Sequence, residues 1–180
     1  AALHRLDLGP RRVGVQPGLF DGEIRRRGVC AIAGKEDVIV MDKLCHASLI
    51  DGARLSGATI RVFPHKNYLK CQELLSGSQN FRRRILVSDS VFSMDGDIAP
   101  LTDLVRLAKS YSAMLYIDDA HATAVLGKGG RGALEYFGIK DDEIIQMGTL
   151  SKAVGSLGAF VCGRKYLIDY LVNKARPLIY

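Results

Sequence analysis

Short apolar segments alternate with helix-like segments along most of the chain, and this alternation limits the possible folds more than any other feature. The apolar segments span four or five residues, which suits strands buried on both faces. The helical segment 46–56 is followed by Gly57, a residue that commonly closes a helix. The expected strands are residues 37–41, 59–63, 85–89, 114–117, 144–147 and 159–162, and the expected helices are 46–56, 68–75, 101–108, 133–137 and 164–174. We therefore expect an α/β fold with a mainly parallel sheet and helices on both faces.

The composition is that of an ordinary globular domain. The 180 residues are 48% apolar and 24% charged, which suffices for one sizeable core. No apolar run approaches the roughly 20 residues needed to cross a bilayer, and no signal-peptide pattern opens the chain. Four cysteines without a C-x-x-C pair favour reduced thiols and a cytoplasmic location. We expect no membrane association and no metal site.

The first 27 residues differ from the rest. They hold six arginines against three acidic residues, which is half of the net charge of +6. No hydrophobic period is visible there, so we expect a divergent, poorly integrated segment 1–27 followed by a domain spanning 28–180. A basic arm for nucleic acid is the alternative, but the sequence has no basic patch interleaved with aromatic residues. We therefore expect a solvated surface and no nucleic-acid partner.

Chemically active side chains follow three of the expected strands. Ser93 follows one strand, Asp118 and His121 follow the next, and Lys152 follows a third. Carboxyl ends of parallel strands share one edge of the sheet, so these side chains can converge. A lysine, a buried aspartate and a histidine suit an aldehyde cofactor with a pyridine ring. The lysine would form an imine, and the aspartate would keep the ring nitrogen protonated.

The loop that carries Lys152 is rich in small and hydroxyl residues. Thr149 and Ser151 could hold phosphate oxygens, and the glycines around them would let the backbone approach a ligand closely. A poorly hydrated lysine in this loop would act as an amine nucleophile. The alternative is a surface lysine in a polar turn, and this segment alone does not decide between the two.

Five motifs extend these expectations. They are residues 41–48, 89–97, 117–127, 130–132 and 148–152. On these motifs the chain from about Gly28 to Tyr180 resembles pyridoxal-phosphate enzymes of fold type I, in particular the α-oxoamine synthase family. The resemblance implies the large domain of that fold, with the small C-terminal domain absent.

The resemblance also implies roles for single residues. Lys152 would carry the cofactor and move the substrate Cα proton, and Asp118 would pair with the pyridinium nitrogen. His121 would contact the ring oxygen with Ser93 nearby, His46 would stack on the ring face, and Thr149 would bind the phosphate. The expected cofactor is pyridoxal 5'-phosphate.

Members of this family join an amino acid to an acyl thioester with loss of carbon dioxide. Residues 118–123 and 148–152 are most similar to the biotin-pathway member, which joins L-alanine to a pimeloyl thioester of coenzyme A or carrier protein. A glycine C-acetyltransferase or another α-oxoamine synthase is the alternative. The partners are thus an amino acid, an acyl thioester and a second copy of the chain in a homodimer.

Several residues depart from the family pattern. Counting back from His46 places Glu23 where the family has an aromatic residue in a phosphate-binding turn, and a carboxylate there would repel phosphate. Arg25 and Arg26 stand where the family has Ala and Asn, and Asp89 stands where many members have Glu. These departures keep a third possibility open, a non-catalytic truncated remnant.

Simpler readings exist for individual residues as well. His46 could be an ordinary residue at a helix start, and His121 and Ser93 could stabilise turns. Asp119 could be a structural acid. Residues 127–132 fit G-x-G-x-x-G, but they do not directly follow a strand, which argues against a dinucleotide site.

Overall fold

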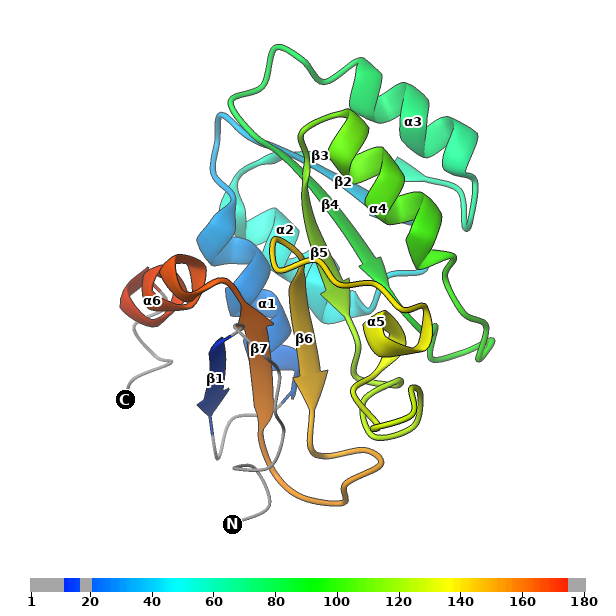
Figure 1. The fold of residues 1–180 in the computed structure, drawn as a ribbon. Coiled ribbons are helices and arrows are strands. Elements are labelled where there is room, and N and C mark those ends of the chain that lie inside the picture. The colour runs from blue at the N-terminus through cyan, green and yellow to red at the C-terminus, as the bar shows by residue number, and fades with distance from the viewer. Residues whose placement is uncertain (1–11, 17–20, 175–180) are drawn as a thin grey trace.

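The computed structural model describes residues 12–16 and 21–174. One seven-stranded sheet has the order β1-β7-β6-β5-β4-β2-β3 and carries helices on both faces (Figure 1). The strands are β1 (Arg12–Gln16), β2 (Val38–Asp42), β3 (Thr59–Phe63), β4 (Arg84–Asp89), β5 (Met114–Asp118), β6 (Ile145–Thr149) and β7 (Ala159–Gly163). The helices are α1 (Asp21–Ile32), α2 (Ala47–Ser56), α3 (Tyr68–Ser76), α4 (Leu101–Ser110), α5 (Ala133–Tyr136) and α6 (Lys165–Lys174).

The sheet is mainly parallel, which confirms the expected fold class. β3, β2, β4, β5 and β6 run parallel to their neighbours, whereas β7 is antiparallel to β6 and β1 is antiparallel to β7. All residues of β2 and β6 are buried, including Asp42 at the end of β2 and Gln146 and Thr149 in β6. β3 lies at the edge of the sheet and has exposed positions.

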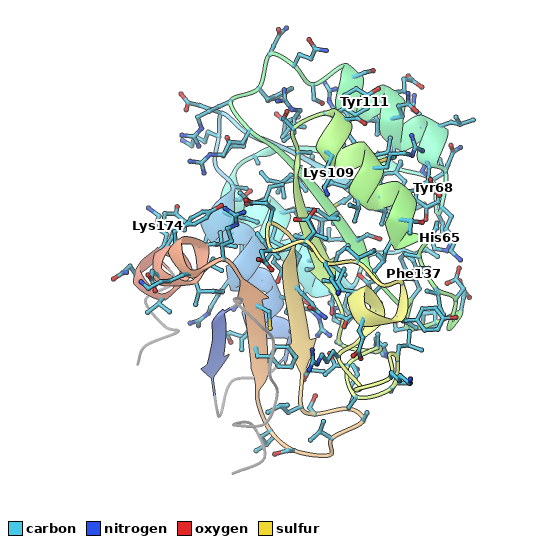
Figure 2. The ribbon with its side chains drawn as sticks, in the orientation of Figure 1. His65, Tyr68, Lys109, Tyr111, Phe137 and Lys174 are labelled. Carbon is cyan, nitrogen blue, oxygen red and sulfur yellow. The ribbon has the colours of Figure 1, made fainter. Side chains whose placement is uncertain are left out.

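Two apolar cores sandwich the sheet. One core joins α1, α2 and α6 to the sheet through residues such as Ile24, Leu49 and Leu171. The other lies under α3, α4 and α5, where Tyr68 and Tyr111 pack against its rim (Figure 2). Each fully buried aliphatic side chain contributes about 1.5–3 kcal/mol, so these two layers hold the strands in register.

Part of the N-terminal segment is well integrated, which differs from the expectation for residues 1–27. α1 begins at Asp21, packs on α2 and buries Ile24 and Arg25, each 2% exposed. No hydrophobic period is visible in this segment because Arg25 occupies a buried position of the helix, and its partner Asp118 lies 93 residues away. α1 continues through residue 28, and β1 pairs with β7 of the main sheet. The structure therefore shows no domain boundary at residue 28. Residues 1–11 and 17–20 lie outside the described residues.

The parallel strands place their carboxyl ends at one edge of the sheet. Asp42, Asp89, Asp118 and Thr149 are the last residues of β2, β4, β5 and β6. Asp89 is paired in register with Asp118. This edge therefore carries the polar residues that the sequence singled out. Within the described part of the chain, no helix is long and apolar enough to cross a membrane.

Candidate functional site

Asp118 lies at the centre of the carboxyl edge. Its Oδ1 accepts a hydrogen bond of 3.0 Å from the backbone N of Ala120. Its Oδ2 accepts one from Nε of Arg25, a residue of α1, and the two side chains are each 2% exposed. Both carboxylate oxygens are thus engaged inside the protein.

Asp89 is the second buried acid at this edge. Its Oδ1 accepts a hydrogen bond of 3.2 Å from the backbone N of His46. Burial, followed by the nearby charge of Asp118, raises the pKa of Asp89 to about 8. With one guanidinium close to two acids, Asp89 keeps its proton at neutral pH while Asp118 forms the ion pair.

His46 caps the N-terminus of α2. Its Nδ1 accepts a hydrogen bond of 3.2 Å from the backbone N of Ser48 and lies 2.8 Å from the Ser48 hydroxyl. The simpler reading of His46 as a helix-start residue is therefore realised. The same contacts fix its imidazole next to the acidic pair, so capping and a binding role are compatible.

His121 lies close to three other predicted residues, His46, Asp118 and Lys152. Burial lowers its pKa, and the positive charge of Lys152 lowers it further. Asp118, Arg25 and His46 also lie close enough to act on its charge. Within residues 21–174, the buried Nε2 of His121 has no hydrogen-bond partner. His46, Asp118 and Lys152 therefore lie within electrostatic range of His121 at the carboxyl edge, and the roles assigned to these residues stay predictions.

The loop after β6 is held by Thr149. Its buried hydroxyl donates to the carbonyl of Gly158 at 3.1 Å and accepts from the backbone N of Ser151 at 3.1 Å. Figure 1 shows this loop, in orange, extending beyond the sheet. Residues 151–157 are all exposed, so Lys152 is well hydrated in this single chain. Of the two alternatives left open by the sequence, the surface lysine describes this single chain, in which no described element covers the loop.

Ser93 follows β4 in an exposed turn. It is exposed in the turn bounded by the bridge between Val91 and Ile98. In the part of the chain that the structure describes, no hydrogen bond or ion pair joins Ser93 to Lys152 or His121. Its role toward a ring oxygen stays a prediction, as does that of Thr149 toward phosphate.

Asp119 and the glycine-rich loop form a structural unit. The carboxylate of Asp119 accepts hydrogen bonds from Nε2 of Gln146 at 2.9 Å and from the backbone N of Ala133 at 3.2 Å. Gly132 has φ of +88°, and a Cβ there would lie 1.7 Å from Oδ2 of Asp119. The glycine is needed for this close approach, so Asp119 orders the start of α5.

The sequence reasoning missed the role of Arg25. It had noted only that Arg25 departs from the family pattern. A signal was nevertheless available, because Arg25, Val29 and Ile32 follow the i, i+4, i+7 spacing of one helix face. An arginine on an apolar stripe requires a buried partner, and here that partner is Asp118.

Glu23 likewise has partners that the sequence did not reveal. Its carboxylate forms ion pairs with Arg26 and Arg27. These contacts, that with Arg27 first, lower the pKa of Glu23. The carboxylate expected to repel a phosphate is therefore largely compensated by two guanidinium groups.

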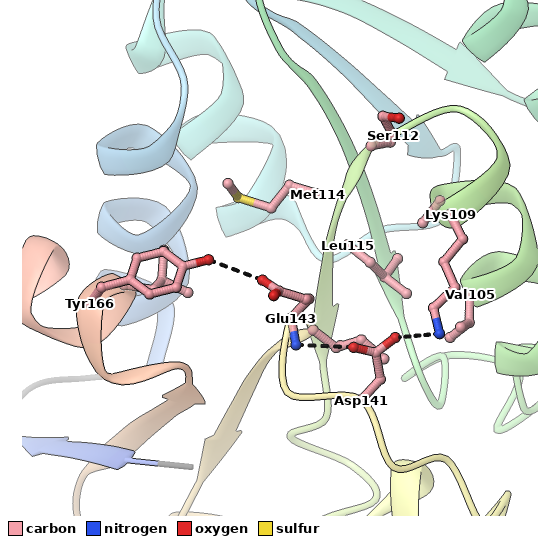
Figure 3. Close-up of a pocket in the computed structure, with 12 residues that line it drawn as sticks. Val105, Lys109, Ser112, Met114, Leu115, Asp141, Glu143 and Tyr166 are labelled. Carbon is pink, nitrogen blue, oxygen red and sulfur yellow. Dashed lines mark hydrogen bonds and ion pairs between the residues drawn. The ribbon is translucent and has the colours of Figure 1, made fainter. Parts of the chain in front are cut away.

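A separate cavity of about 450 Å³ lies at the opposite edge of the sheet (Figure 3). It is bounded by the end of α4, the start of β5 and Tyr166 of α6. Its polar groups pair with one another: Lys109 with Asp141 at 2.8 Å, and the Tyr166 hydroxyl with Glu143 at 3.0 Å. This cavity is distinct from the Lys152 site.

Comparison with known proteins places this geometry in a family. The family model described as aminotransferase class I and II matches residues 23–180. Curated relatives include a putative 8-amino-7-oxononanoate synthase of Aquifex aeolicus, 56% identical over 83% of this chain and 40% of the relative. The 8-amino-7-oxononanoate synthase 1 of Bacillus subtilis is 50% identical over 83% of this chain and 38% of its own length. The chain therefore spans about two fifths of these relatives.

Solved structures agree with this match. A serine palmitoyltransferase variant of S. paucimobilis with bound PLP–myriocin aldimine superposes with a TM-score of 0.85 and 31% identity, covering 94% of this chain and 42% of that one. The 8-amino-7-oxononanoate synthase of Francisella tularensis gives a TM-score of 0.79 and 32% identity, covering 94% of this chain and 48% of that one.

Proposed function

Because the chain belongs to the aminotransferase class I and II family, we propose that it is the cofactor-binding part of a transferase that uses pyridoxal 5'-phosphate (PLP). The reaction is the condensation of an amino acid with an acyl thioester, with loss of carbon dioxide. Relatives named 8-amino-7-oxononanoate synthase, at 50% identity or more, favour L-alanine and a pimeloyl thioester in biotin synthesis. Serine palmitoyltransferases share the fold, so another amino acid and acyl chain are the alternative.

The observation that carries this proposal is the convergence around His121. One amine, two imidazoles and one buried acid come from the carboxyl ends of three strands, β2, β5 and β6. PLP supplies an electron sink next to the amino acid when it is bound. Lys152 would hold its aldehyde carbon, His46 and His121 its ring and ring oxygen, with Ser93 nearby, and Thr149 its phosphate.

One part of the site does not fit this cofactor. A protonated pyridine nitrogen needs the carboxylate as its charged partner, and Oδ2 of Asp118 is already paired with the buried guanidinium of Arg25 while Oδ1 accepts from Ala120.

The proposal includes a homodimer in the cytoplasm. Val154 and Leu157, on the Lys152 loop, are 49% and 73% exposed, and a second copy of the chain would cover them. All four cysteines are free, which agrees with a reducing compartment.

Covalent capture of PLP at Lys152 tests the proposal. The chain is incubated with PLP, reduced with borohydride and mapped by peptide mass spectrometry, beside Lys152→Arg and the matched loop variant Lys128→Arg. We expect the adduct at Lys152 in the wild type and in Lys128→Arg, and its loss in Lys152→Arg. A well-folded wild type without an adduct at Lys152 would favour the non-catalytic remnant.

The substrate is tested separately. L-Alanine, glycine and serine are each paired with pimeloyl-coenzyme A, pimeloyl carrier protein, acetyl-coenzyme A and palmitoyl-coenzyme A. We expect carbon dioxide release with L-alanine and a pimeloyl donor. Release with glycine and acetyl-coenzyme A alone would replace the biotin-pathway assignment by a glycine C-acetyltransferase.

A further inference from the structure

We propose that Arg25 is a built-in competitor of the cofactor, because its guanidinium takes the carboxylate of Asp118 that the pyridine nitrogen requires. The inference rests on the proposed function, since it concerns the same site. It adds a residue that controls how tightly the site accepts a pyridine ring.

The geometry of the ion pair supports this competition. Nε of Arg25 binds Oδ2 of Asp118, while Oδ1 is held by the backbone N of Ala120. Both charged side chains are 2% exposed, so water does not weaken their attraction. A protonated ring nitrogen that approaches Asp118 therefore competes with the guanidinium for the same negative charge.

The ion pair is strong, but one nitrogen of the guanidinium lacks a hydrogen-bond acceptor in the part of the chain that the structure describes. A ligand can therefore displace the Arg25 side chain. Within the described residues, the buried Nη2 of Arg25 has no hydrogen-bond partner. An unpaired buried donor is unfavourable, which lowers the cost of moving the guanidinium away. Asp118 meanwhile keeps its bond from Ala120, and the carboxylate stays oriented toward the site.

The backbone that carries Arg25 has little freedom to withdraw. Ile24 is buried beside it, and α1 lies so close to α2 that a Cβ on Gly52 would come within 2.5 Å of the Arg26 carbonyl oxygen. The side chain of residue 25, and not a movement of the helix, therefore determines whether the pyridine ring can bind Asp118. A neutral side chain there would leave Asp118 free for the ring.

Cofactor affinity in matched variants tests this inference. PLP is titrated into wild type, Arg25→Met, Arg25→Ala and Arg26→Ala, and binding is followed by absorbance and by the fraction of Lys152 trapped with borohydride. Arg25→Met retains the apolar stem, so it preserves packing if Arg25→Ala does not fold. Arg26→Ala removes the neighbouring charge, whose partner is Glu23, without touching Asp118.

We expect the dissociation constant for PLP to fall about tenfold or more in Arg25→Met and to stay within about twofold of wild type in Arg26→Ala. Equal affinity in wild type and Arg25→Met, with the Lys152 adduct formed in both, would overturn the competition and leave the proposed function standing. No adduct at Lys152 in either the folded wild type or the folded Arg25→Met, at any PLP concentration, would overturn both.

Discussion

At the scale of single residues, the charges at the carboxyl edge set the chemistry of the site. Asp89 and Asp118 are neighbours across β4 and β5, and the guanidinium of Arg25 binds Asp118. Asp89 consequently has a pKa of about 8 in the folded chain, against about 3.9 in an unfolded one. Raising the pH through this window ionises Asp89 more readily in the unfolded state, so stability falls.

The variant Asp89→Asn tests this balance. The amide keeps an acceptor for the backbone N of His46 and cannot ionise, so it should gain stability relative to wild type as the pH rises from 5 to 8. We expect the relative gain to be at least about 1.4 kcal/mol, the value of one pKa unit. Urea unfolding at both pH values measures it, and Asp95→Asn, at an exposed position, is the control. A difference that does not change with pH would show that Asp89 is already ionised.

Some residues of the site could be predicted from the sequence and others could not. His46, Asp118, His121 and Lys152 could be predicted because each stands next to a readable strand or helix end. Arg25 could not, since its partner lies 93 residues away and nothing local indicates which carboxylate it meets. The exposure of Lys152 was equally hidden, because hydration depends on what covers a loop and not on its sequence.

At the scale of elements, helices and strands were predicted within a few residues, and the packing between them was not. Strand and helix types follow from apolar period and from residues such as Gly57, which has φ of 73° at the end of α2. Of α1, the sequence predicts only a helix-like end at residues 31–33 before Gly34, because the buried face of the helix contains an arginine. The strand order and the pairing of β1 with β7 depend on contacts between distant segments.

The contact between α1 and α2 gives a matched pair of variants. Gly52→Ala would place a Cβ 2.5 Å from the backbone carbonyl of Arg26, and backbone cannot move aside as a side chain can. We expect it to destabilise the fold by about 2 kcal/mol. Gly22→Ala, whose Cβ would meet Ser48 at an ordinary 3.6 Å, should leave stability unchanged or slightly higher. Urea denaturation compares the two, and equal effects would mean that the helices are not so closely packed.

The glycine-rich loop before α5 gives a second pair. Gly132→Ala combines a backbone conformation that only glycine adopts easily with a clash against the Asp119 carboxylate, and should cost about 3 kcal/mol. Gly138→Ala also has a positive φ, of +66°, but its Cβ meets nothing within 4 Å, so we expect about 1 kcal/mol. Thermal unfolding of both variants separates the clash from the backbone strain. A Gly132→Ala variant no worse than Gly138→Ala would remove the structural role assigned to Asp119.

At the scale of the whole molecule, the buried acids and one histidine act in the same direction. Burial raises the pKa of Asp119 to about 6. Burial and the charge of Asp118 raise the pKa of Asp89 to about 8. Because both values exceed those of the unfolded chain, Asp119 and Asp89 contribute less stability as the pH rises above about 4. Salt bridges lower the pKa of Asp97 and Glu23, so their contribution is lost as the pH falls below about 4. The fold should therefore be most stable near pH 5 and less stable at pH 8.

His65 connects two loops at the carboxyl edge and adds to this profile (Figure 2). Its Nδ1 lies 3.0 Å from Asp42 and its Nε2 lies 3.0 Å from Asp97, so both nitrogens donate only when the ring is protonated. Burial opposes the charge, but the two carboxylates prevail and raise the pKa of His65. A raised pKa means that its contribution is complete below about 6.5 and is lost as the pH rises through the folded value.

The variant His65→Gln tests this connection. Glutamine can hydrogen-bond one carboxylate but carries no charge, so His65→Gln should be less stable than wild type by about 1 kcal/mol at pH 5.5 and nearly equal to it at pH 9. Urea unfolding at the two pH values gives the comparison, and Gln72→Ala, at an exposed position of α3, controls for unrelated effects of substitution. A deficit that persists unchanged at pH 9 would mean that His65 holds the loops by packing against Phe92 and not by its charge.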